Sequence, residues 1–61
     1  MKVKIHYEER IDVFSDVIFW SLVTRKVDNI YKAFAVLCFP YDGIREVDIS
    51  DSIKVTSLDI N

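Results

Sequence analysis

The segment that decides the fold is residues 30–39, which read IYKAFAVLCF. Alternate residues of a strand point to opposite faces of its sheet, and here both sets are almost wholly apolar. A strand of this kind is covered on both faces. One face carries Ala33, Ala35, Leu37 and Phe39, and its two small residues allow close packing over that side. We therefore expect another layer, or another chain, to cover it.

A second apolar run, residues 17–23, reads VIFWSLV and is separated from the first by the charged stretch TRKVDN. Its β-branched and aromatic residues favour a strand over residues 16–24. Asp28 and Asn29 both tolerate left-handed backbone, so they predict a tight turn that makes the two runs neighbouring strands.

A helix over residues 12–25, capped by Ser15 and packed on a three- to four-stranded antiparallel sheet, is the α+β alternative. Such a helix would be apolar on all sides and would need a surrounding core. A chain of 61 residues has little sequence left to build one, so the strand is preferred.

The remaining segments also indicate short strands and turns. Residues 2–8 alternate between charged and apolar side chains, as a half-buried strand does. Residues 8–16 are mostly polar and predict a loop or an irregular strand. The turn at residues 40–43 contains the only proline and the only glycine, and a strand over residues 44–49 follows. After a turn at residues 50–52 comes a last strand that extends to Ile60, with a bulge expected near Ser57.

These elements predict an all-β fold of about five short strands, in one domain over residues 1–61. Closure into a small antiparallel barrel, or strong curling of one sheet, would remove exposed strand edges. The pattern of residues 40–58 is a hairpin, a strand, a one-turn kink and a final strand. It resembles the second half of an SH3-like or Sm-like barrel. The resemblance implies a fold and transfers no function.

Size and composition limit the classes of protein. A domain this small buries only about 60% of its unfolded surface, so it usually needs a disulfide, a metal or a partner chain. Cys38 is the only cysteine, so no internal disulfide can form, and it lies in an apolar run where we expect a buried, reduced thiol. The amino-terminal residues do not form a signal peptide, and both apolar runs are too short to cross a membrane. We expect a cytoplasmic protein with no membrane partner.

The sequence contains no pattern typical of catalysis or metal binding. The only histidine, His6, lies between Lys4 and Glu8 on the polar side of the first strand, where we expect it to be solvated. A pairing of His6 with Cys38 across a sheet is conceivable but has no supporting motif. The carboxylates lack the spacing of a metal site, and one glycine cannot form a phosphate loop. We therefore expect no enzyme activity, no cofactor and no metal.

Large aromatic and aliphatic side chains are the one excess in the composition, and such residues are enriched at the centres of interfaces. We expect a non-enzymatic protein-interaction module that self-associates as a homodimer. An accessory or inhibitory protein of bacterial or phage origin, with a protein partner still to be identified, is compatible with this. The candidate interface residues are Trp20, Tyr31, Ala33, Ala35, Leu37, Phe39 and Tyr41.

Nucleic-acid binding by a small barrel is the alternative function. Lys2, Lys4, Arg25 and Lys26 would form one basic patch if the first strand lay beside the turn that follows Lys26. Trp20, Tyr31 or Tyr41 would then offer a face for base stacking. The net charge of −2 counts against this function.

Overall fold

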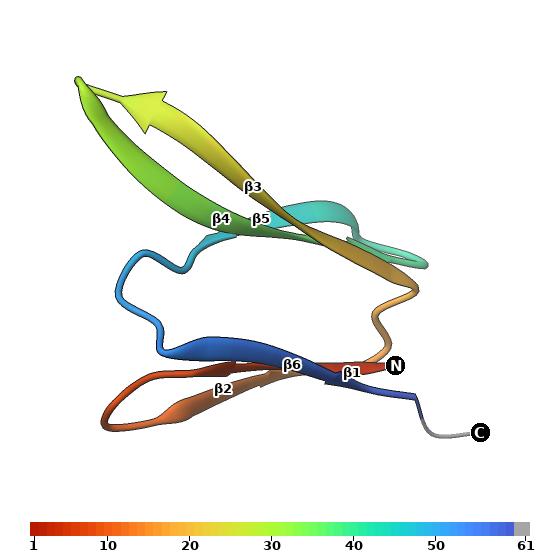
Figure 1. Cartoon of the computed structure of the whole chain (residues 1–61). Coiled ribbons are helices and arrows are strands. Elements are labelled where there is room, and N and C mark those ends of the chain that lie inside the picture. Colours follow the sequence, from red (N-terminus) through yellow and green to blue (C-terminus); the bar gives the residue numbers. More distant parts are fainter. Residues whose placement is uncertain (60–61) are drawn as a thin grey trace.

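The computed structural model describes residues 1–59 and contains six strands in two three-stranded sheets that face each other (Figure 1). All the strand pairs are antiparallel. One sheet has the order β2-β1-β6 and the other the order β3-β4-β5. The strands are β1 (Lys2–His6), β2 (Ile11–Phe14), β3 (Phe19–Val27), β4 (Ile30–Phe39), β5 (Gly43–Asp48) and β6 (Lys54–Leu58).

The all-β prediction is confirmed, but the predicted five-stranded barrel is wrong. The extra strand is β2, which lies in the polar segment expected to be a loop or an irregular strand. In the described residues no ladder joins one sheet to the other. Along one open side, the guanidinium of Arg45 lies 5.7 Å from the centre of the Phe14 ring. A side-chain contact therefore occupies a place where a closed barrel would have backbone hydrogen bonds.

The helix alternative for residues 12–25 is also wrong, because this region holds the end of β2, a crossing segment and most of β3. The deciding feature is the turn at Asp28 and Asn29, whose φ angles are 51° and 65°. Two consecutive residues with positive φ form the tight hairpin turn that best matches the twist of paired strands. Residues 19–27 consequently pair one to one with β4. Residues 1–59 contain no helix, and hence none long and apolar enough to cross a membrane.

The predicted strand over residues 30–39 is confirmed as β4, and Gly43 takes a positive φ of 76° where β5 begins. The predicted bulge near Ser57 is wrong, because β6 pairs with β1 without interruption from Lys54 to Leu58. Leu58 simply points to the solvent-exposed face of its sheet. The expected end of the strand at Ile60 lies outside the described residues.

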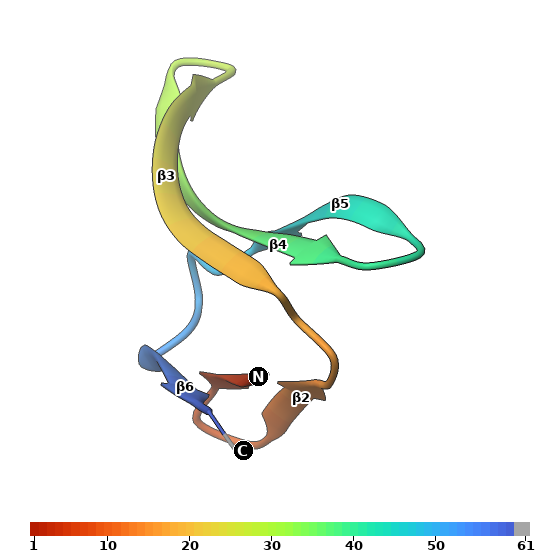
Figure 2. The same cartoon turned by 90° about the vertical axis from the view of Figure 1, so that its right-hand side faces the viewer.

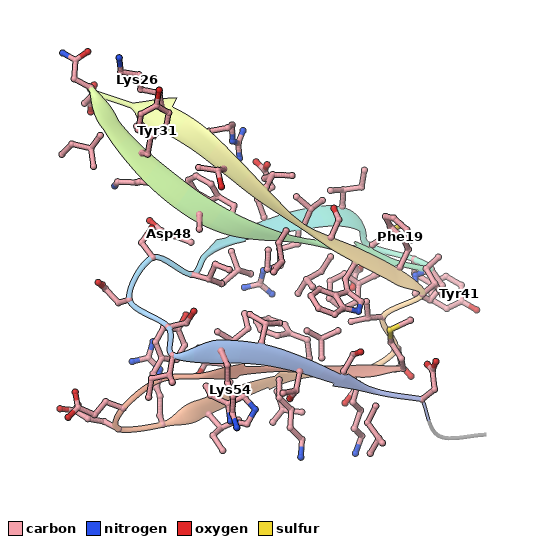
Figure 3. All side chains as sticks on the ribbon, viewed as in Figure 1. Phe19, Lys26, Tyr31, Tyr41, Asp48 and Lys54 are labelled. Carbon is pink, nitrogen blue, oxygen red and sulfur yellow. The ribbon has the colours of Figure 1, made fainter. Side chains whose placement is uncertain are left out.

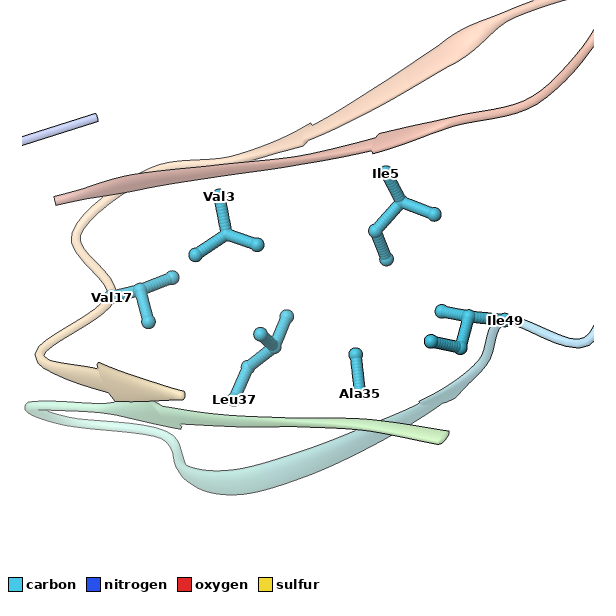
Figure 4. Close-up of a cluster of buried hydrophobic side chains, with 6 residues drawn as sticks. All are labelled: Val3, Ile5, Val17, Ala35, Leu37 and Ile49. Atoms are coloured by element: carbon cyan, nitrogen blue, oxygen red, sulfur yellow. The ribbon is translucent and has the colours of Figure 1, made fainter. Parts of the chain in front are cut away.

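The core lies between the two sheets (Figure 4). Val3 and Ile5 of β1 face Ala35 and Leu37 of β4, and all four side chains are fully buried. The two ends are filled from the segments that cross between the sheets, by Val17 and Ile49. The N–H of Ile49 donates to the carbonyl of Ala33 at 2.9 Å, and that of Ile53 donates to the carbonyl of His6 at 2.7 Å. These bonds fix one crossing to both sheets.

Leu37→Ala should destabilise the fold by about 2–5 kcal/mol, because it removes buried methyl groups and leaves a cavity in a close-packed layer. In a domain this small such a loss unfolds much of the population. Urea denaturation followed by circular dichroism measures it. Ile53→Ala, at a side chain that is 67% exposed, is the control and should change stability by less than about 0.5 kcal/mol. Equal stability of the two variants would contradict this description of the core.

Candidate functional site

The β3–β4 hairpin extends beyond the other sheet, as Figures 1 and 2 show. We call its outer part, residues 23–34, the arm. β4 has ten residues and β1 has five, so the core sheet cannot cover the whole hairpin. The arm curves toward the side of β5 (Figure 2). It is the one large part of the described chain with no second layer over it.

Two ion pairs connect the arm to β5. The Arg25 guanidinium donates a hydrogen bond to the Glu46 carboxylate and lies 4.5 Å from the centre of the Phe34 ring. The hydrogen bond to Glu46 raises the pKa of Arg25 above its ordinary value. The ammonium of Lys32 lies 3.9 Å from the Asp48 carboxylate. These contacts connect the arm to β5 and neutralise the charges of Arg25 and Lys32.

Asp48 also anchors the crossing segment that follows β5. Its carboxylate accepts a hydrogen bond from the Ser50 N–H at 2.9 Å, and the Ser50 hydroxyl accepts one from the Ala33 N–H at 3.2 Å. The backbone bond from Ser50, then the Ser50 side chain and the charge of Lys32, hold the pKa of Asp48 below its ordinary value of 3.8. The ionised carboxylate is therefore part of the folded structure.

Large apolar side chains are exposed on the β3-β4-β5 sheet, on and beside the arm (Figure 3). Phe19 is 62% exposed and Ile44 71% exposed on the face turned away from the core. Leu22 lies on the opposite face of β3 and is 55% exposed although its cross-strand partner Ala35 is fully buried, because β3 is the edge strand of its sheet. Exposed apolar residues thus lie on both faces of the hairpin. The others on this sheet and at its ends are Ile18, Val27, Ile30, Tyr31 and Tyr41.

The residues predicted as a partner interface divide into two groups. Ala35 and Leu37 are fully buried under the other sheet, and Trp20, Ala33 and Phe39 are partly buried against the same core. Tyr31 and Tyr41 are 72% and 96% exposed, but they flank opposite ends of β4. The face of β4 that was predicted to be covered by another layer or chain is therefore covered within the chain. The exposed residues Phe19 and Ile44 were not among the predicted interface residues.

The predicted basic patch is not assembled. Lys2 and Lys4 lie on the outer face of β1, which pairs with β2 and β6. Arg25 and Lys26 lie near the tip of the hairpin in the other sheet. The outer face of β2-β1-β6 instead brings Lys54 opposite His6. The position of Lys54 depends on the β1–β6 register, which adjacent residues in the sequence do not reveal.

The catalytic and metal-site candidates are also separate. The His6 Nε2 atom lies 2.9 Å from the Thr56 hydroxyl on the outer face of one sheet. Cys38 is partly exposed on the outer face of the other sheet, so the two cannot act together. Residues 1–59 contain no group of three or more side chains that could hold a metal ion.

A groove of about 570 Å³ lies at the end of the sandwich where β3 begins. Its walls come from Met1 and from residues 15–18 and 39–42. Asp16 and Asp42 are its acidic side chains, and no described lysine, arginine or histidine lines it. None of the described side-chain hydrogen bonds joins the Ser15 hydroxyl of this groove to either carboxylate.

No protein-family model, curated protein or solved structure matches this chain.

Asp48→Asn should lower stability at neutral pH, because the neutral amide can accept the Ser50 bond but carries no charge. A carboxyl whose pKa is lowered in the folded state stabilises that state above pH 3.8, and the effect is lost as the pH falls through the folded pKa. The difference from the unaltered chain should thus vanish in acid, as thermal unfolding over a pH series would measure. Asp51→Asn makes the same charge change, and an equal pH-dependent loss in both variants would contradict the role assigned to Asp48.

Proposed function

We propose that this protein is a small, non-enzymatic interaction module that self-associates as a homodimer. The observation that carries the proposal is the exposure of apolar side chains on both faces of the β3–β4 hairpin. Scattered exposed apolar residues are normal on a protein surface, whereas a contiguous set commonly marks an interaction site.

The size of the chain supports the same proposal. In the described residues the fully buried core is confined to the region between the two sheets, while Phe19, Leu22 and Ile30 remain more than half exposed. Association would remove this apolar surface from water, at about 25 cal/mol per Å² of apolar area buried. A second copy would thereby supply stability that a short chain with a single cysteine cannot obtain from a disulfide.

Phe19→Ser should weaken self-association, because it removes a large apolar side chain from the exposed face of β3. Sedimentation velocity at tens of micromolar would measure the dimer fraction of the unaltered chain and of the variant. Ile53→Ser is the matched control, since Ile53 is similarly exposed, at 67% against 62%, but lies in a segment between the sheets. We expect the control to keep the dimer fraction of the unaltered chain.

A clean monomer for the unaltered chain over this concentration range would refute the proposed function. Equal loss of dimer in Phe19→Ser and Ile53→Ser would place the interface away from the hairpin.

A second candidate function is the binding of a nucleic-acid strand on the outer face of β2-β1-β6. The observation that favours it is the charge of this face, which carries Lys2, Lys4 and Lys54. None of the described strand residues on the same face is acidic. This set replaces Arg25 and Lys26 of the sequence-based hypothesis with Lys54. Base stacking has no support here, because the apolar side chains on this face are aliphatic.

Lys4→Glu should abolish any binding of labelled single-stranded DNA or RNA at low salt, whereas Lys26→Glu should leave it nearly unchanged. Both variants alter the net charge equally, but only Lys4 lies on the basic face. Fluorescence anisotropy with a salt titration measures the effect, and affinity should fall steeply with salt. No binding by the unaltered chain at low salt would end this candidate.

A further inference from the structure

Each sheet of the sandwich has two edge strands, and they differ in how well they are protected. Edge strands present unpaired backbone groups, which proteins protect by short length, charged side chains, proline or bulges. β2 has four residues and β6 has five. β5 has six and carries Arg45 and Glu46. β3 has nine residues, so it is the longest edge in the described structure.

β3 also lacks the other protective devices. It contains no proline, and its one-to-one register with β4 leaves no bulge. Its charges, Arg25 and Lys26, are confined to the end near the turn, and the five residues from Phe19 to Val23 are uncharged. In the described residues β3 pairs with β4 alone, and its outer part lies on the projecting arm (Figure 2). A second strand can therefore approach it.

The turn determines which backbone groups of β3 face the free edge. In a two-residue hairpin the flanking residues, Val27 and Ile30, exchange both hydrogen bonds, and bonded and non-bonded pairs then alternate along the ladder. The bonds of Ala33 agree with this pattern, because its N–H and C=O bind Ser50 and Ile49 on the side away from β3. Its partner Thr24 therefore directs its own N–H and C=O away from β4. The free groups of β3 belong to Trp20, Leu22, Thr24 and Lys26.

We propose that β3 of one copy pairs antiparallel with β3 of a second copy about a two-fold axis at Val23. The two β3-β4-β5 sheets then become one continuous six-stranded sheet. This inference rests on the proposed function, because it names the surface through which the chain self-associates.

This register follows from length, backbone direction and charge. Centring on Val23 pairs the whole nine-residue strand with its copy. It places even-numbered residues opposite even-numbered ones, so the free N–H and C=O groups of Leu22 meet those of Thr24. Phe19 lies opposite Val27 of the second copy, which gives both exposed side chains a cross-strand apolar neighbour.

The charges oppose other arrangements. In the register centred on Val23, Arg25 lies opposite Ser21 and Lys26 lies opposite Trp20, whose ring can accept a cation. An antiparallel register centred on Arg25 would place the two Arg25 guanidinium groups side by side. Parallel in-register pairing would place Arg25 beside Arg25 and Lys26 beside Lys26. Like charges directly opposite each other destabilise a sheet.

Thr24→Pro tests whether the free backbone edge of β3 forms the dimer. Thr24 is exposed and its N–H points away from β4, so proline removes a hydrogen bond to the second copy without removing one from the hairpin. We expect the variant to keep the far-ultraviolet circular dichroism of the fold and to sediment as a monomer at tens of micromolar. Thr24→Ala keeps the N–H and is the matched control, expected to remain a dimer.

A cysteine pair tests the register. In a Cys38→Ala background, Val23→Cys would place two thiols in a non-hydrogen-bonded pair, where Cβ atoms are about 4.5–5.5 Å apart. A disulfide can bridge this Cβ–Cβ distance after a small movement of the two strands, so mild oxidation should give a covalent dimer. Ser21→Cys in the same background is the control, because its copies would be four residues apart, about 13 Å along the strands, and should remain monomeric on a denaturing gel.

The outcomes separate the two proposals. A monomeric unaltered chain refutes both of them. A dimeric unaltered chain, with a folded Thr24→Pro variant that is still a dimer, refutes β3 pairing and leaves self-association standing. If Thr24→Pro unfolds, the cysteine pair decides, since a failure of Val23→Cys to cross-link faster than Ser21→Cys also refutes the pairing.

Discussion

The rest of the structure depends on the packing of β1 against β4. Val3 and Ile5 meet Ala35 and Leu37 across the gap between the sheets, and all four are fully buried. The small side chain of Ala35 lets the layers approach, and Leu37 fills the space beside it. Each three-stranded sheet is the only cover for the apolar face of the other in the described residues. Without this contact both faces would be exposed to water, and a sheet of three strands needs a packed face to be stable.

The same contact explains why part of the molecule is left uncovered. β1 is half the length of β4, so the layer built on β1 covers only the part of the hairpin nearest the core. The arm beyond it ends in the short turn at Asp28 and Asn29 and contacts β5 through two ion pairs. Val27, Ile30 and Tyr31 of the arm are exposed, and in the described residues β3 has a neighbouring strand on one edge only. The surface proposed for self-association thus combines this uncovered part of the hairpin with the free edge of β3.

Local patterns in the sequence predicted some elements well and others poorly. The strand predicted over residues 2–8, observed as Lys2–His6, the turn at Asp28 and Asn29 and the strand over residues 30–39 were all predictable, because each depends on neighbouring residues. β2 was predicted only as one of two options, a loop or an irregular strand, since its four residues lie in a mostly polar segment and form a strand by pairing with β1. The interface candidates were predicted from one apolar strand face and from aromatic side chains, and these signals do not distinguish Leu37, buried in the core, from Phe19, exposed on the opposite face of the sheet.

The sequence by itself favoured an all-β fold over the α+β alternative, and it indicated which segments alternate and where the tight turn at Asp28 and Asn29 lies. These properties follow from side-chain periodicity and from backbone preferences that act over a few residues. Only the tertiary structure decided that the strands form two sheets, that one apolar face of β4 is covered from within the chain, and that Lys54 joins Lys2 and Lys4 on one face. The reason is that pairing and layer contacts join residues far apart in the chain, so their register depends on the whole fold.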